Sequence, residues 1–224
     1  MAAGKYPWKI CQGADEQLVF QWLDARGLGV DLSAYTLRMQ IREPDRTAAT
    51  AALSLTETPN ANGSVIEALT EVIIAPVATT SFVAATATVN AEIGAVGAGF
   101  SLDEAEVAYS TTGVPTSARL VTTPVARIGD LARVASSTSN DGDYVISSIV
   151  DGDVVRVLGD VTAEAAAGTV ALIRYGLIQI TLDSVDTTAM DFTVGEYDVE
   201  IVDGAGVVTR VLQGTFKVDQ EVTR

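Results

Sequence analysis

Residues 195–224, which read GEYDVEIVDGAGVVTRVLQGTFKVDQEVTR, decide the fold of this chain. Tyr197, Val199 and Ile201 alternate with acidic residues, which is the period of a strand with one buried and one solvated face. Residues 203–206, Asp-Gly-Ala-Gly, tolerate positive φ angles, so they predict that the chain reverses there as a hairpin.

The return strand of this hairpin is predicted to bury its even-numbered residues. Gly214 lies within it and is predicted to mark a β-bulge, since a glycine inside a strand often does. The apolar residues of the buried parity are Val208, Leu212, Phe216 and Val218.

Working outward, the rest of the chain repeats the pattern of short strands and turns. Residues 35–42 alternate cleanly, and residues 144–149 and 154–158 predict a hairpin across 151–153. Short helical turns are predicted at 101–108, 162–168 and 184–190. Other strands are predicted at residues 6–11, 18–23, 51–55, 64–68, 125–134, 169–175 and 177–182.

Composition agrees with this pattern. The chain has 224 residues, of which 48% are hydrophobic and only 6% aromatic, so its core is expected to consist mainly of Val, Ile and Leu. No long helical period and no βαβ spacing occur. The sequence therefore predicts an all-β fold of the sandwich or small-barrel type.

Two groups of residues, separated by about a hundred positions, carry a resemblance. The first group is Trp8, Gly13-Ala14-Asp15, Phe20-Gln21-Trp22, Asp31-Leu32 and residues 35–42; the second is Ile178, Thr187, Phe192, residues 195–199, Gln213-Gly214 and residues 222–224. Together they resemble a small β-sandwich domain of tailed bacteriophages. That domain occurs at the amino terminus of baseplate upper proteins and in related tail-tip or fibre-adaptor proteins.

The resemblance implies an immunoglobulin-like sandwich made of residues 1–68 and 176–224. Residues 69–175 are then expected to form a second small β-domain, inserted in a hairpin loop, because such tips tolerate insertions. Residues 129–134, 139–146, 164–168 and 170–173 resemble a β-module that recurs in phage structural proteins. Residues 72–90 match neither pattern, and residues 72–100 are expected to form an Ala/Thr-rich arm.

What the resemblance implies about function is a virion structural role in the tail, baseplate or neck, as an assembly or fibre-attachment platform without enzymatic activity or cofactor. Other virion proteins are the expected partners, in a homo-oligomer of three- or six-fold symmetry. The inserted module is a candidate for contact with the host surface. Two alternatives stay open: a capsid decoration or head-fibre protein, and a protein that binds or degrades host polysaccharide.

The net charge of -15 is spread along the chain, which argues against binding to a nucleic-acid backbone. Residues 72–91 lack charge but contain Pro76 and many Thr residues, so no membrane span is expected. The first eight residues lack the apolar segment of a signal peptide. Cys11, the single cysteine, excludes an internal disulfide and is predicted to be a small buried residue.

Candidate chemistry is sparse, and no catalytic, cofactor-binding or metal-binding residue is assigned. The chain has no histidine, which excludes Ser-His-Asp and histidine-metal sites. Acidic pairs are interpreted as turn formers or solvated faces, rather than as glycosidase or calcium sites. These pairs are Asp141/Asp143, Asp151/Asp153 and Asp198/Glu200.

Three further patterns receive structural interpretations. Residues 94–99, Gly-Ala-Val-Gly-Ala-Gly, lack the lysine of a phosphate-binding loop and predict a flexible connector. Residues 62–64, Asn-Gly-Ser, match a glycosylation acceptor by chance at a turn. Core anchoring is favoured over a ligand platform for four aromatic residues. These are Trp8, Phe20, Trp22 and Tyr35.

Overall fold

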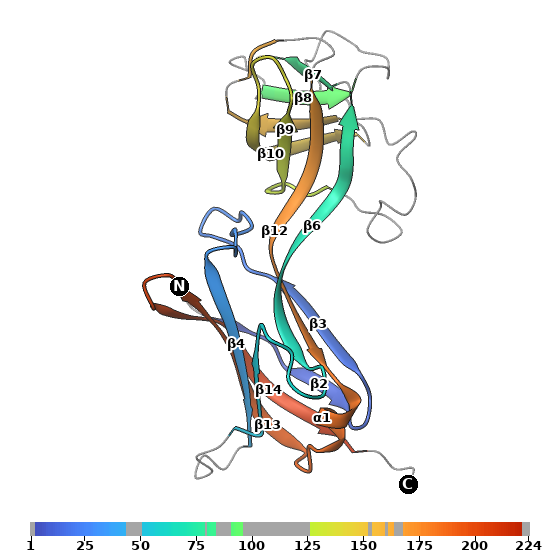
Figure 1. The fold of residues 1–224 in the computed structure, drawn as a ribbon, viewed down its shortest axis with the longest axis vertical. Coiled ribbons are helices and arrows are strands. Elements are labelled where there is room, and N and C mark those ends of the chain that lie inside the picture. Colours follow the sequence, from blue (N-terminus) through green and yellow to red (C-terminus); the bar gives the residue numbers. More distant parts are fainter. Residues whose placement is uncertain are drawn as a thin grey trace. The chain divides into compact units, whose positions relative to one another are not determined.

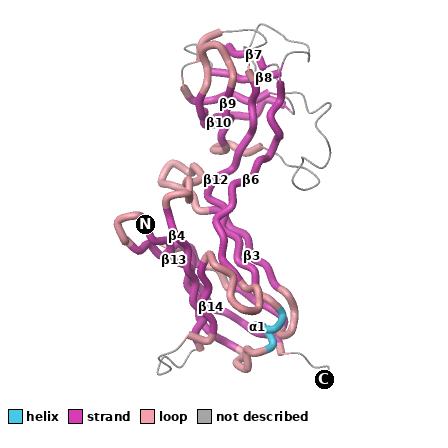
Figure 2. The backbone as a smooth tube through the Cα atoms, viewed as in Figure 1, coloured by secondary structure: helices cyan, strands magenta, loops and turns pink. Residues whose placement is uncertain are grey.

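A computed structural model describes residues 3–43, 51–78, 80–83, 91–95, 126–151, 154–159, 161–163 and 168–220. Contacts within the chain divide it into two compact units. Unit 1 comprises residues 1–22, 30–69 and 176–224, and unit 2 comprises residues 23–29 and 70–175. Most of the described residues lie in β-strands, and the one helix among them, α1 (Ser184–Thr188), lies in unit 1 (Figure 2).

The first sheet of unit 1 brings the two ends of the chain together. Its path runs β1 (Gly4–Lys5), β14 (Val208–Asp219), β13 (Val194–Asp203), β4 (Tyr35–Arg42) and β5 (Leu53–Thr56), and β2 (Trp8–Cys11) also pairs with β14. β13 lies antiparallel to β4 from Glu196 opposite Arg42 to Asp203 opposite Tyr35 (Figure 1). The carboxy-terminal hairpin and residues 35–42 therefore belong to one sheet.

The second layer of unit 1 is formed around β12 (Thr169–Leu182). Its residues 177–182 pair antiparallel with β3 (Glu16–Gln21), and β6 (Val65–Ala78) also pairs with β12. The opposed sets β14-β13-β4-β5 and β3-β12-β6, with β1 and β2 parallel to the last strand, form an all-β sandwich with an immunoglobulin-like strand order. α1 lies in the connection between β12 and β13, where a helical turn was expected.

The core of unit 1 lies between these two layers. Met39, Val199 and Phe216 from the first sheet meet Ile178 and Ile180 from β12, and all five are essentially inaccessible to solvent. β4 and β13 bury alternate residues, because successive side chains of a strand point to opposite faces. The remaining buried members of this cluster are Trp8, Ile10, Leu32, Leu37, Ile41, Leu55, Ile66, Leu182, Met190, Tyr197, Ile201, Val211, Leu212 and Val218.

The closing hairpin differs from expectation in the position of its bulge. The pairing of β13 with β14 shifts register between Val199 and Glu200, so Val211 is the extra residue, and Val211 and Leu212 are both buried. Before the bulge the even-numbered residues of β14 face away from the core, and after it they face the core. Val208 is therefore 45% exposed. The prediction of a bulge at Gly214, with Val208 on the buried face, was wrong because the bulge lies three positions earlier.

Gly214 has another structural role. A Cβ at this position would lie 1.9 Å from the carbonyl oxygen of Tyr6, so only glycine lets the amino-terminal segment approach β14 this closely. That segment is held there by Tyr6, whose amide donates to the Gln213 carbonyl at 3.0 Å. The hydroxyl of Tyr197 donates to the Tyr6 carbonyl at 2.8 Å.

Residues 169–182 were expected to form two strands but form the single strand β12. Gly176, which was taken as the boundary, has φ of 80° and marks the point where the pairing partner changes. Residues 169–173 pair with β9 (Leu131–Ala135), whereas residues 177–182 pair with β3. A glycine accommodates this irregularity without ending the strand.

Unit 2 contains the predicted hairpin and a smaller core. β10 (Gly142–Asp151) pairs antiparallel with β11 (Val154–Leu158), which confirms the pairing of residues 144–149 with 154–158. β9 pairs with β10, and β8 (Ala91–Ala95) joins β11 to β7 (Thr80–Val83). The buried apolar cluster is composed mainly of small side chains: Ala126, Ala132, Val134, Ile146, Val155, Val157, Val161, Val170 and Leu172.

Two further expectations are corrected. Cys11 is exposed rather than buried, because β2 buries Trp8 and Ile10 and turns the alternate residues Lys9 and Cys11 outward. Gly94 lies inside β8, paired with Val154 and with Ser81, so residues 94–95 are not a flexible connector.

Several expectations fall wholly or partly outside the described residues. The helix at 101–108 and residues 96–99 lie outside them, as do residues 164–167 of the expected turn at 162–168. Of the expected arm at 72–100, the described parts are β-strands in β6, β7 and β8.

Candidate functional site

The outward face of the first sheet of unit 1 carries a two-dimensional array of polar side chains. On β4 the alternation that buries Leu37, Met39 and Ile41 turns Arg38, Gln40 and Arg42 away from the core. Because residues opposite each other on paired strands share a face, the strand register aligns these side chains in rows. One row is Arg210, Glu200, Arg38 and Thr56; the second is Lys5, Gln213, Asp198, Gln40 and Ser54; the third is Thr215, Glu196 and Arg42.

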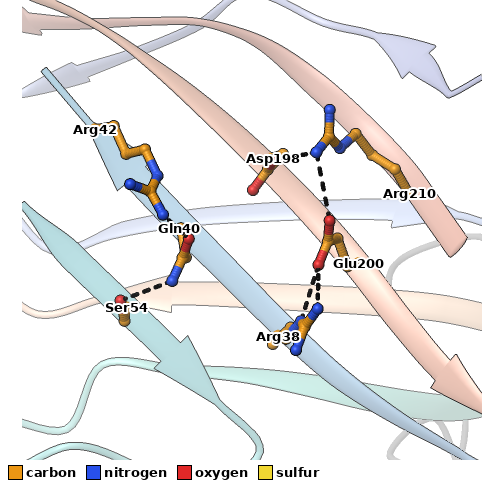
Figure 3. Close-up of polar contacts among 7 residues, drawn as sticks. All are labelled: Arg38, Gln40, Arg42, Ser54, Asp198, Glu200 and Arg210. Atoms are coloured by element: carbon orange, nitrogen blue, oxygen red, sulfur yellow. Dashed lines mark hydrogen bonds and ion pairs between the residues drawn. The ribbon is translucent and has the colours of Figure 1, made fainter. Parts of the chain in front are cut away.

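Three residues of the first row, Arg38, Glu200 and Arg210, form a network of ion pairs with Asp198 of the second row (Figure 3). Two nitrogens of the Arg38 guanidinium contact Oε2 of Glu200, at 2.9 and 2.7 Å. Arg210 reaches Asp198 at 3.0 Å and Glu200 at 3.4 Å. The bulge at Val211 makes these contacts possible, since without it Arg210 would point into the core. The network holds both carboxylates and both guanidinium groups in fixed positions on the surface.

The second row contributes amide groups beside this network. Gln40 donates to the hydroxyl of Ser54 at 3.5 Å and accepts a hydrogen bond from Arg42 at 2.5 Å. Across β13, Gln213 accepts from Arg210 at 3.4 Å. Side chains of the three rows thus orient one another across the sheet (Figure 3).

A pocket of about 660 Å³ opens over these rows. The amino-terminal segment forms one side of it, because Gly214 and the Tyr197 hydroxyl hold Tyr6 against β14. Tyr6 is 46% exposed and contributes an aromatic surface to the lining. The full lining is Lys5, Tyr6, Pro7, Gln40, Arg42, Glu43, Glu196, Tyr197, Asp198, Arg210, Gln213, Gly214 and Thr215.

Asp198 and Glu200 lie in different environments. Burial raises the pKa of Asp198, and this effect outweighs the neighbouring Arg210, which lowers it. Glu200 contacts two arginines, Arg38 and Arg210. Burial also raises the pKa of Tyr197, whose hydroxyl serves as a donor to Tyr6.

Asp141 and Asp143 each make hydrogen bonds of their own. Asp141 accepts from the amide of Ser137 at 2.8 Å, and this hydrogen bond lowers its pKa. Asp143 forms two hydrogen bonds of 2.7 Å with Arg133, which lower its pKa. The two carboxylates thus serve different local contacts. The side chain of Asp151 and all of Asp153 lie outside the description.

The four aromatic candidates do not form one platform. Trp8 is 4% exposed and makes edge-to-face contacts with Tyr197 and Phe216. Trp22 and Tyr35 make a separate edge-to-face pair, with ring centroids 5.7 Å apart, and Phe20 packs against the same core. The interpretation as core anchors is therefore confirmed for all four.

The Asn62-Gly63-Ser64 turn is tied into unit 1 by one carboxylate. Asp186 of α1 accepts hydrogen bonds from Asn60 at 2.7 Å, from Asn62 at 2.6 Å and from the Ser64 hydroxyl. Burial raises the pKa of Asp186, but the three donors outweigh it and leave the pKa below its usual range. Ser64 is completely buried and its hydroxyl donates to Asp186, so the serine of this tripeptide serves the fold.

Sequence reasoning missed both the pocket and a buried ion pair in unit 2. Arg174 donates to both carboxylate oxygens of Asp130, each at 3.0 Å, and the two side chains are 7% and 2% exposed. Neither position shows a sequence signal, because the partners are 44 residues apart. The pocket did have a sequence signal. The even-numbered residues of 36–42 are polar, and the even-numbered residues of 196–200 are acidic.

Comparisons with known proteins leave the site without a precedent. No family model matches the chain, and searches of curated proteins and of solved structures found no match. Among the described residues, no group of three or more potential metal ligands occurs. In the same residues, no helix is long and apolar enough to cross a membrane.

Proposed function

We propose that this chain is a non-enzymatic structural protein of a tailed-bacteriophage virion, in the tail, baseplate or neck. Its sandwich serves there as an assembly or fibre-attachment platform. The observation that carries the proposal is the pairing of β13 with β4. It joins strands from the two separated groups of residues that resemble the phage sandwich domain, and both groups contribute to one core.

The polar face of the first sheet suits a platform. Its charged side chains already engage one another at the surface, as in the Arg38–Glu200–Arg210 network. Such a face can meet a partner with little loss of side-chain freedom, since preorganised groups lose less entropy on association. Complementary charges at such a surface would set specificity and the rate of encounter more than affinity.

Purified phage particles provide the test. Quantitative mass spectrometry of particles banded on a density gradient should detect the chain at a copy number divisible by three or six. Symmetric assembly is the norm for such components. A lysate fraction from which particles have been removed is the control. Finding the chain only in that fraction would overturn the proposal.

The same particles separate the alternatives. Antibody labelling of tails or necks supports the platform, and labelling of heads would instead indicate a capsid decoration or head-fibre protein. Release of reducing sugar from host polysaccharide by the purified chain would indicate an enzyme. That result would contradict the non-enzymatic assignment.

A further inference from the structure

We infer that the pocket over the first sheet of unit 1 binds a neutral, hydroxyl-rich oligosaccharide. The pocket is the volume of about 660 Å³ bounded by the amino-terminal segment and by β4, β13 and β14. This volume lies within the range of roughly 300–1,000 Å³ that is usual for small-ligand sites. The inference concerns binding only, and it does not depend on where the chain resides in a particle.

The floor of the pocket offers donors and acceptors in a regular arrangement. Gln213, Asp198 and Gln40 stand opposite one another on three adjacent strands, which lie about 4.8 Å apart in a sheet. Amide groups both donate and accept, a carboxylate accepts, and guanidinium groups donate. Each hydroxyl of a sugar both donates and accepts. Neighbouring hydroxyls can therefore pair with the amide and carboxylate groups that follow one another along a row.

The charges in the pocket favour an uncharged ligand over an ionic one. Arg210 is paired with Asp198 at 3.0 Å and with Glu200 at 3.4 Å, so its charge is already compensated. The lining also contains acidic and basic residues in equal number: Glu43, Glu196 and Asp198 against Lys5, Arg42 and Arg210. An anionic group bound at Arg210 would therefore have to displace existing ion pairs, whereas a neutral ligand can use their remaining lone pairs and N–H groups.

The wall of the pocket supplies the apolar contact that a sugar ring requires. Tyr6 is 46% exposed and is followed by Pro7, and both residues line the pocket. An amphipathic aromatic ring provides apolar area at a low cost in conformational entropy. Sugars present C–H groups on the faces of the ring and hydroxyls at its edge, so a ring could contact this wall and the polar floor together.

Isothermal titration of the full chain with four neutral tetrasaccharides tests the inference: maltotetraose, cellotetraose, laminaritetraose and a rhamnose tetrasaccharide. Binding of at least one is expected. The Gln213→Ala and Gln40→Ala variants should each weaken it by about tenfold, the effect of losing one or two hydrogen bonds. Gln179→Ala is the matched control, since Gln179 lies on β12 in the other sheet and should leave binding unchanged.

Salt and a charged probe separate the sources of binding. Affinity for a neutral tetrasaccharide should change little between low and high salt, because screening acts on charges. Binding of a poly-glutamate peptide in place of the sugars would overturn the inference and indicate an acidic protein partner. Failure of all four sugars to bind, or equal losses in Gln179→Ala and Gln213→Ala, would also overturn it. None of these results depends on the copy number in particles.

Discussion

The two units of the molecule have cores of different kinds. In unit 1, large side chains such as Phe216, Met39 and Ile180 fill the space between two layers, and Trp8 and Tyr197 pack edge-on against Phe216. In unit 2 the buried cluster consists mostly of alanine and valine. Apolar stabilisation scales with buried area, so larger side chains contribute more at each buried position of unit 1. Among the described residues of unit 2, the buried Asp130–Arg174 pair lies in addition to the apolar cluster.

The largest expected effect lies in the core of unit 1. Phe216→Ala should lower the free energy of unfolding by about 4 kcal/mol, because it leaves a cavity at a completely buried position. Both tryptophans of the chain, Trp8 and Trp22, belong to unit 1, so tryptophan fluorescence in urea follows that unit. A loss below about 1 kcal/mol would contradict the account of this core.

A somewhat smaller effect is expected from the ion pair of unit 2. Asp130→Asn leaves the buried Arg174 without its carboxylate, and we expect a loss of about 3 kcal/mol. The change should appear in far-ultraviolet circular dichroism of the whole chain and leave the tryptophan-monitored transition in place. If the circular dichroism and fluorescence transitions shift equally, the two units unfold together. The difference between their cores would then not correspond to a difference in stability.

The hydrogen bonds around Asp186 are expected to contribute less, and their contribution should depend on pH. Asp186→Asn should cost about 2 kcal/mol at pH 7, because an amide replaces an acceptor for three donors. The folded-state pKa lies below the ordinary value of 3.8. The stabilisation is therefore complete above that value and is lost as the pH falls through the folded-state pKa.

Urea denaturation of wild type and Asp186→Asn at a series of pH values checks this sign. The difference between the two proteins should be largest at neutral pH and should shrink in acid. Ser184→Ala, whose side chain lies outside the triad of donors, serves as a control on α1. A difference that grows as the pH falls would contradict the assignment.

The smallest expected effect belongs to the ion pairs on the sheet surface. Glu200→Gln should cost about 0.5 kcal/mol, since pairs with half-exposed partners such as Arg38 gain little net energy. The loss should diminish in high salt, where exposed charges are screened. Paired denaturation curves at low and high salt measure it. A loss as large as that of Asp130→Asn would mean that the surface network stabilises the fold.

Much of the sandwich could be predicted because a period of two is a local property. The alternation in residues 35–42 and 197–201 identified the buried faces of β4 and β13, and Asp203-Gly204-Ala205-Gly206 located the turn. The exposure of Cys11 was also readable, since Trp8 and Ile10 share the opposite parity. The prediction that Cys11 is buried followed the general preference of cysteine for burial rather than the alternation of residues 8–11.

The features that escaped prediction depend on distant partners. Nothing near Val211 distinguishes a bulge from a regular strand, because the extra residue exists only relative to β13. The closeness of Gly214 to Tyr6 joins positions about two hundred residues apart, and the Asp130–Arg174 pair joins the residue before β9 to the interior of β12. The pocket depends on the approach of Tyr6 to Gly214 and on the bulge that turns Arg210 outward, which is why the sequence indicated its residues but not their assembly.

The missing side chain at position 214 has a consequence for engineering. One added methyl group there would meet the Tyr6 carbonyl and push the first residues of the sheet outward. The width of the pocket would change, whereas the identities of the charged and amide side chains on its floor would not. Position 214 is thus where ligand size could be adjusted separately from ligand chemistry.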